Sequence, residues 1–342
     1  MVGEAFSSGL AHMRMGEPAS ALTPADCLGD GALIARRNAT GCPRGSWPDI
    51  IAGVVPRKAP VTLINVGANK GYSLVNFMAL WSQHQVSPLK WHQGIMKYAK
   101  NHNHRWLSQY GCGFCHDCRA HMPQKHGRTS GVAHALELTA NNRNMLREVA
   151  SETGLSIRVH DEAVSNVTGS MVYIPTFTGG ETRSLRSIDD RLCRSSGACT
   201  ESVNVTTIDE FLSRKSIRSV YQLSIDTEGH DALVLEGAEE AIRARRVALI
   251  EFEVNRNGFW TIQRRNPLFP ERRTLRTVMR KLTAVGYGCF WQSSSGLVPL
   301  SGPCWRPEFD QFRRWSNILC AHEAPVVAAL VRLAKEASRD RV

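Results

Sequence analysis

The residues with the clearest chemical potential follow one apolar run of the chain. The run Val220–Ile225 leads directly into Asp226-Thr-Glu228-Gly-His230, and helix-spaced apolar residues come next. Carboxylate and imidazole groups can accept protons from a reacting group, and the carboxyl ends of parallel strands face the ligand crevice. The pattern predicts a site with Asp226 or His230 as the proton acceptor, bordered by Glu228. A strand-end cap at Asp226 and a hydrogen-bonded helix-start residue at His230 are the structural alternatives.

A glycine turn predicts a ligand-binding loop earlier in the chain. The β-branched run Val61–Val66 precedes Gly67-Ala68-Asn69-Lys70-Gly71, and apolar residues over 72–81 suit a helix. Glycines allow a sharp turn close to a ligand, and a helix N-terminus offers free N–H groups. The spacing matches neither the dinucleotide fingerprint nor a P-loop, so an ordinary strand-to-helix turn is the alternative to a nucleotide-like ligand site.

An acidic residue ends the next predicted strand, over residues 132–138. Glu137 lies near the end of that strand, and a polar-capped helix is expected over 139–149. In a doubly wound sheet, an acidic residue at this position can accept hydrogen bonds from both ribose hydroxyls. A solvated strand-end carboxylate is the alternative.

A polar stretch, residues 85–131, is expected to be an insertion. It holds six of the twelve histidines and a Cys-x₂-Cys-x₂-Cys motif. Thiolates and imidazoles at this spacing can bind a structural Zn²⁺ tetrahedrally. Free thiols or a disulfide are equally compatible, and an iron–sulfur cluster would usually need a fourth cysteine. The predicted zinc ligands are Cys112, Cys115, Cys118 and His121.

The remaining pattern predicts an α/β domain with a mainly parallel sheet. Further strands are expected over 155–159, 169–175, 202–206 and 247–254, with closing antiparallel strands over 286–291 and 316–322. Helices are expected after Thr207 and over 274–285 and 324–338. The predicted organisation is an N-terminal extension (1–60), one domain (61–322, including the insertion) and a C-terminal helix (323–342).

Composition limits the partners and the location. The chain has 342 residues, 42% of them apolar, and a net charge of +11. The basic residues are scattered, so a solvated basic surface is expected before a nucleic-acid interface. No long apolar run or secretory signal is visible, which predicts a soluble chain without a transmembrane segment. Ten cysteines and three glycosylation sequons leave both a cytoplasmic location and a lumenal one, as a processed fragment, open. The pairs Cys27/Cys42, Cys193/Cys199 and Cys289/Cys304 could close short disulfide loops.

Several motifs occur together in the order expected for a known family. They are VTLINVGANKGYSL, HALELTANNRNML, DEAVSN, VTTIDEFL, YQLSIDTEGHDALVLEGA and LIEFE, over about residues 61–254. This order resembles the FkbM-type family of S-adenosylmethionine-dependent methyltransferases. The resemblance implies the class I methyltransferase fold, a Rossmann-like, doubly wound, seven-stranded sheet, and methylation of hydroxyl groups on small molecules or sugars.

The resemblance also implies roles for individual residues. Glu137 would hold the cofactor ribose, Asp161 or Glu162 would lie near the adenine, and Asp226, Glu228 and His230 would border the methyl-transfer site. The departures are Asn65 in place of aspartate, Leu138 in place of proline, and His230-Asp231 in place of Ala-Glu. The residues expected around the methionine part of the cofactor are Asn65, Gly67, Ala68, Asn69 and Gly71.

Three functions remain open from the sequence. The first is S-adenosylmethionine-dependent O-methylation of a small-molecule or glycan hydroxyl. The second is RNA methylation, which the charge and the Cys/His stretch would suit and which predicts salt-dependent RNA binding. The third is a cofactor-binding or zinc-stabilised interaction protein without turnover.

Overall fold

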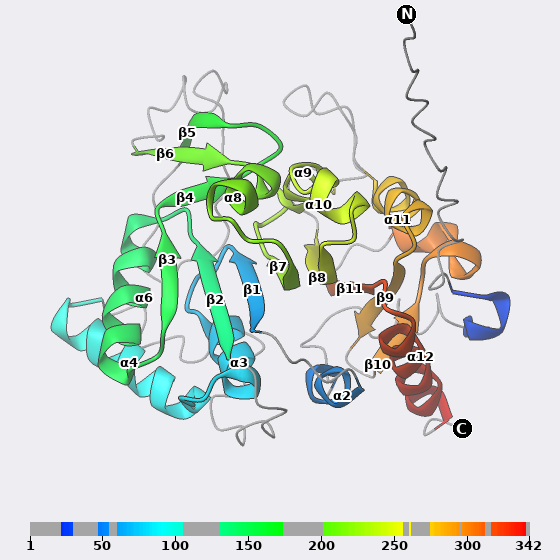
Figure 1. The fold of residues 1–342 in the computed structure, drawn as a ribbon, viewed down its shortest axis with the longest axis horizontal. Coiled ribbons are helices and arrows are strands. Elements are labelled where there is room, and N and C mark those ends of the chain that lie inside the picture. Colours follow the sequence, from blue (N-terminus) through cyan, green and yellow to red (C-terminus); the bar gives the residue numbers. More distant parts are fainter. Residues whose placement is uncertain are drawn as a thin grey trace, which may run out of the picture.

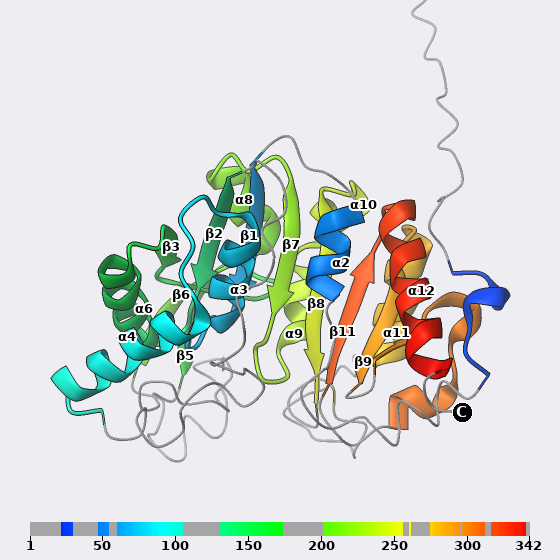
Figure 2. The same cartoon turned by 90° about the horizontal axis from the view of Figure 1, so that it is seen from below.

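A computed structural model describes residues 22–29, 47–54, 60–104, 130–173, 201–255, 260, 274–293, 296–311 and 316–339. Figures 1 and 2 show one broad twisted sheet with helices on both faces. Its strand order is β10-β9-β11-β8-β7-β1-β2-β3. The strand bounds are β1 (Val61–Val66), β2 (Gly131–Leu136), β3 (Ile157–His160), β7 (Val220–Ile225), β8 (Val247–Val254), β9 (Gly288–Ser293), β10 (Gly296–Pro299) and β11 (Ser316–Ala321).

Five neighbouring strands of the sheet are parallel, and the three strands at the other edge are antiparallel to their neighbours. Strands β3, β2, β1, β7 and β8 run parallel, and β11 pairs antiparallel with both β8 and β9. These pairings confirm the α/β class and the predicted antiparallel closing pair. The implied number of seven strands is wrong for this sheet, which has eight strands in the described chain. The extra strand is β10, a hairpin partner of β9 within residues expected to form a loop.

A second, three-stranded sheet has the order β4-β6-β5. It consists of β4 (Glu162–Val164), β5 (Gly169–Tyr173) and β6 (Glu201–Thr206), close to the predicted bounds for the last two. Helix α8 (Ile208–Arg214) follows at once, and the Thr207 hydroxyl accepts a hydrogen bond from the Glu210 N–H at its start. This contact is half of a capping box, and it starts the helix that the sequence predicts after Thr207.

Helices cover the main sheet in two layers, as Figure 1 shows. One buried cluster joins the sheet to α2 (Trp47–Val54), α3 (Tyr72–Trp81), α4 (Pro88–Asn101), α6 (Ala140–Thr153) and α12 (Ala324–Arg339). The other joins the opposite face to α8, α9 (Asp231–Glu236), α10 (Glu239–Arg243) and α11 (Leu275–Ala284). Burial of both faces explains why the central strands are almost continuously apolar.

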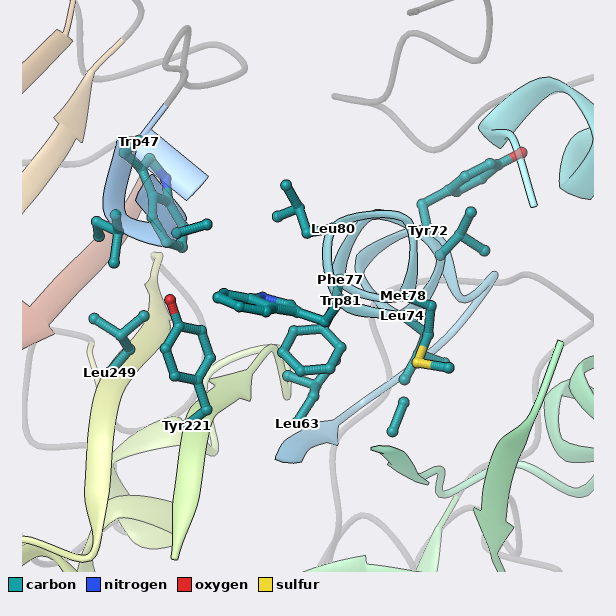
Figure 3. Close-up of a cluster of buried hydrophobic side chains, with 14 of the residues drawn as sticks. Trp47, Leu63, Tyr72, Leu74, Phe77, Met78, Leu80, Trp81, Tyr221 and Leu249 are labelled. Carbon is teal, nitrogen blue, oxygen red and sulfur yellow. The ribbon is translucent and has the colours of Figure 1, made fainter. Parts of the chain in front are cut away.

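Aromatic side chains fill the first of these layers (Figure 3). Trp81 of α3 packs edge-on against Tyr221 of β7, with ring centroids 5.1 Å apart. Trp47 lies in the same cluster as Leu63 of β1, so α2 is packed against the sheet although it belongs to the predicted N-terminal extension. The division of the chain into an extension, a domain and a C-terminal helix stays a prediction.

Only the start of the predicted Cys/His-rich insertion lies among the described residues. It forms α4, whose Trp91, Ile95 and Tyr98 are buried against α3 and α6. The four predicted zinc ligands, Cys112, Cys115, Cys118 and His121, lie outside the described residues. Where the structure does describe the chain, no group of three or more His, Cys, Asp or Glu residues is arranged to hold a metal ion.

Two disulfides connect distant parts of the chain. Cys27 bonds to Cys304, and Cys289 of β9 bonds to Cys320 of β11, directly opposite it in the antiparallel ladder. The predicted pairs Cys27/Cys42 and Cys289/Cys304 are therefore wrong. The disulfides were predicted from cysteines that are close in the sequence, whereas the fold brings together two cysteines that are 277 positions apart. The pair Cys193/Cys199 lies outside the described residues.

Candidate functional site

The glycine turn after β1 adopts the backbone conformation that its sequence predicts. Gly67 and Gly71 both have φ of 78°, and Asn69 has φ of 43°. A Cβ atom on residue 67 would lie 1.9 Å from the carbonyl oxygen of Asp226, which follows β7. Glycine is therefore required at position 67 by its dihedral angle and by the approach of a second strand end. The turn ends with Gly71 as the N-cap of α3.

Helix α4 contacts this turn through a hydrogen bond from Trp91. The Trp91 indole N–H donates a hydrogen bond to the Lys70 carbonyl oxygen over 2.8 Å, and Trp91 is fully buried. A Cβ on residue 71 would come within 2.7 Å of Leu146 of α6. Sequence reasoning missed Trp91 because it assigned residues 85–131 to a polar insertion. The apolar spacing of Trp91, Ile95 and Tyr98 is the signal that could have revealed the helix.

Glu137 lies directly after β2 and is only 4% exposed. Its Oε2 accepts a hydrogen bond from the Asn69 backbone N–H over 2.8 Å. Its Oε1 accepts from the Thr139 N–H and hydroxyl and from the Asn142 amide. The carboxylate therefore links the β2 end to the glycine turn, and it is buried rather than solvated.

Asn65 is buried on β1 at 2% exposure. Its Oδ1 has no hydrogen-bond partner within the described part of the chain. A buried acceptor without a donor costs about 1–3 kcal/mol, so this oxygen is suited to a donor group from a ligand.

Asp161 and Glu162 lie farther along the same edge and take part in ion pairs. Asp161 contacts Arg143 and Arg147 of α6. Glu162 contacts Arg214 of α8 over 2.6 Å. Asp161 is exposed and stands at the end of β3, one strand beyond Glu137. Their predicted position near an adenine stays a prediction.

The turn after β7 is organised around a buried carboxyl group. Asp231 is fully buried and accepts hydrogen bonds from the N–H groups of Thr227, Gly229 and Glu253. Burial raises the pKa of Asp231 to about 7. The turn holds Glu228 at a positive φ of 55° and leaves Asp226 exposed.

His230 points to a different part of the molecule. Its Nε2 lies 2.9 Å from the Ser165 hydroxyl, which follows β4 of the small sheet, and the ring is 5% exposed. The structure thus separates the three predicted catalytic residues: Asp226 borders the glycine turn, Glu228 lies in the β7 turn, and His230 bonds to Ser165.

The β8 carboxyl groups, which the site prediction did not include, lie beside this turn. Burial, followed by the nearby carboxylates of Asp226, Asp231 and Glu228, raises the pKa of Glu253. Glu251 accepts hydrogen bonds from Gln292 over 2.7 Å and from Gln222 over 3.3 Å. The edge of the sheet around β7 and β8 is therefore acidic although the whole chain is basic.

Five of the predicted cofactor residues converge with Glu137 at one place. Asn65, Gly67, Ala68, Asn69 and Gly71 lie at the carboxyl end of β1, beside the ends of β2 and β7. The strand order reverses direction between β1 and β7, and such a switch point is where open α/β sheets bind ligands. Fold and turn together define a doubly wound α/β protein with a candidate ligand site at its switch point.

Comparison with known proteins identifies the family. The model of the methyltransferase FkbM domain matches residues 65–288, which is more than half of the chain. The chain therefore belongs to the FkbM methyltransferase family, which confirms the resemblance. No curated protein matches it.

A solved structure from Methylobacillus flagellatus, described as methyltransferase FkbM, is similar at 13% identity and a TM-score of 0.36. The alignment covers 79% of this chain and 47% of that chain, so this chain spans about half the length of that protein.

Proposed function

We propose that the chain is an S-adenosylmethionine-dependent methyltransferase that methylates a hydroxyl group on a small molecule or glycan. The observation that carries the proposal is the glycine turn at the switch point, closed against Asp226 on one side and held by Glu137 on the other. The family membership supports the methyl-transfer chemistry.

The residues present fit this cofactor. The turn packs closely against the Asp226 backbone at Gly67 and ends at Gly71, the N-cap of α3, so the free N–H groups of a helix N-terminus lie at the switch point. The unpartnered Oδ1 of Asn65 can accept a hydrogen bond from an ammonium group, and the Glu137 carboxylate can accept from a ribose hydroxyl. When bound, the cofactor would supply a methyl group on a positively charged sulfur. The protein's own task would be to align the acceptor and remove its proton.

The acidic edge favours a small molecule or glycan over RNA. The carboxylates of Asp226 and Glu228, in the turn beside the glycine turn, would repel phosphates there. The net charge of +11 is a property of the whole chain, so it does not by itself indicate a nucleic-acid substrate at this site.

Calorimetric titration with S-adenosylmethionine tests the proposal. We expect micromolar binding by the wild-type chain and at least tenfold weaker binding by Glu137→Gln. Glu152→Gln is the matched control, because this exposed carboxylate of α6 contacts Lys97 far from the turn. An absence of binding by the folded wild-type chain would leave an interaction protein as the better interpretation. Binding would justify a screen of sugar and small-molecule hydroxyl acceptors, with RNA as the competing substrate.

We further propose that the chain folds in an oxidising compartment. Two disulfides between distant segments support this location, because thiols are kept reduced in the cytosol. No helix in the parts of the chain that the structure describes is long and apolar enough to cross a membrane. Peptide mapping without reductant should recover the Cys27–Cys304 and Cys289–Cys320 linked fragments from protein isolated from its native source.

A further inference from the structure

Polar residues stand in one row across the three central strands. Asn65 of β1 is in register with Ser224 of β7, which is in register with Glu251 of β8. Residues in register on parallel strands project from the same face of the sheet, and so does every second residue of a strand. Glu253 therefore projects from the same face as Asn65, two residues nearer the carboxyl edge. This face of the sheet is polar at the switch point.

Asn65 indicates that this face meets a ligand. The side chain is 2% exposed, and its Oδ1 has no hydrogen-bond partner within the described residues. Buried polar atoms are nearly always paired in folded proteins. An orphaned acceptor on the same face of the sheet as Glu251 and Glu253 is therefore best explained by a donor that arrives with a bound molecule.

Glu253 is the carboxyl group on this face with the most suitable surroundings. The Asn255 amide donates a hydrogen bond to its Oε2 over 2.6 Å, which orients the group. Its Oε1 receives no hydrogen bond from the part of the chain described here, and the residue is only half-buried. Glu251 differs, because two glutamine side chains already occupy its two oxygens. One oxygen of Glu253 can therefore receive a proton from a neighbouring molecule.

We propose that Glu253 takes the proton from the acceptor during methyl transfer, an assignment that rests on the proposed function. The acceptor oxygen bonds to the methyl carbon and displaces a neutral thioether, whose sulfur keeps the electron pair of the broken bond. The proton of the acceptor O–H passes to the Glu253 carboxylate and then to solvent. His230 is less suited to this role because its Nε2 faces Ser165.

The charges around Glu253 make its protonation state depend on whether the cofactor is bound. Burial and the carboxylates of Asp226, Asp231 and Glu228 raise its pKa, which favours the protonated form in the free chain. A positive charge brought to this edge favours the ionised form instead. Binding of the positively charged methyl donor therefore shifts Glu253 toward the carboxylate that can take the proton of the acceptor.

Proton release on ligand binding tests this assignment without an acceptor. S-adenosylmethionine and S-adenosylhomocysteine are titrated into the chain at pH 7.5 in buffers of different ionisation enthalpy. The two ligands differ by the positive methyl group on sulfur, so the difference between them isolates the effect of that charge. We expect the wild-type chain to release about one more proton with the methyl donor. Glu253→Gln should bind both ligands with no such difference.

Two further variants complete the test. Glu253→Asp keeps a carboxyl group and should retain the proton release, whereas Glu240→Gln alters an exposed carboxylate of α10 and should behave as wild type. Thermal unfolding monitors folding, and Glu253→Gln should not lower the melting temperature, because the raised pKa already favours an uncharged carboxyl group at this position in the free chain. Equal proton release from wild type and Glu253→Gln would overturn the assignment of Glu253 but not the proposed function. A folded wild-type chain that binds neither ligand would overturn the proposed function and this assignment with it.

Discussion

The Asn69 backbone N–H and the Glu137 Oε2 are joined by a hydrogen bond of 2.8 Å across 68 residues of sequence. This contact ties the glycine turn after β1 to the end of β2. The remaining donors to Glu137 come from Thr139 and Asn142 at the start of α6. A residue expected to contact a cofactor thus also sets the shape of the loop that would hold it.

Glu137→Gln should weaken cofactor binding and destabilise the fold. The amide offers one acceptor oxygen in place of two, so either Asn69 or the Thr139 group faces an NH₂ donor, at a cost of about 2 kcal/mol. Thr139→Val is the control: it removes one donor to Oε1 but leaves the contact with Asn69 intact. We expect the control to lose stability without a change in affinity beyond about twofold. Urea unfolding and calorimetry measure the two effects, and equal affinity in both variants would contradict the prediction.

Gly67→Ala should destabilise the chain by about 3 kcal/mol, because the new Cβ both requires a left-handed backbone and collides with the Asp226 carbonyl. Gly302→Ala separates the two causes. That glycine also has a left-handed φ, of 59°, but the nearest side-chain atom to its Cβ position, Thr283 Cγ2, is 3.7 Å away. The substitution should cost only about 1 kcal/mol. Similar losses for the two variants in chemical unfolding would show that the close approach contributes nothing.

His230 and Ser165 should be coupled energetically. Removal of either partner removes a hydrogen bond between two buried side chains, so His230→Asn and Ser165→Ala should each cost about 1–2 kcal/mol. The double variant should lose less than the sum of the two, because the second change removes no further contact. The proton release proposed for Glu253 should persist in Ser165→Ala. Additive losses in urea unfolding would argue against the contact.

Acid should destabilise the chain through a pair of histidines. His134 Nδ1 and His160 Nε2 lie 3.0 Å apart, both rings pack against Phe211, and burial lowers both pKa values to about 4. An unfolded histidine titrates near 6.5, so the unfolded chain binds more protons between pH 6.5 and 4. Stability should be highest well above pH 6.5 and fall as pH drops toward 4, by up to about 3 kcal/mol for each histidine.

Urea midpoints measured at intervals from pH 7.5 to 4.5 measure this effect. His160→Gln keeps a polar partner for His134 but removes one titrating group, so the midpoint should depend less on pH over that range. An unchanged slope in the variant would exclude the histidine pair as the source of the acid sensitivity.

Reduction of Cys27–Cys304 should lower stability more than any exposed substitution. The bond closes a loop of 277 residues, for which chain entropy predicts a contribution of about 5 kcal/mol as an upper value. Cys27→Ser should therefore lower the melting temperature by at least several degrees and reduce the response to reductant to the part that comes from Cys289–Cys320. A melting temperature that reductant does not change would mean that this bond contributes little to the native state.

The sequence by itself determined the local elements around the site. Val61–Val66 and Tyr72–Trp81 were predicted at their observed bounds, because alternating or helix-spaced apolar residues and a glycine turn act over a few positions. The order of the motifs identified the family. The register that places Asn65 beside Ser224 and Glu251 required the assembled sheet, since strand pairing is a long-range property.

Tertiary structure alone decided which polar residues face one another. The sequence placed Asp226, Glu228 and His230 together, but the turn around Asp231 directs His230 to Ser165. The pairing of β7 with β8 places Glu253 beside the turn that follows β7. The cysteine partners, the eighth strand and the contact of Trp91 with the glycine turn have the same origin. Each depends on side chains brought together over tens or hundreds of residues, where sequence spacing carries no information about distance.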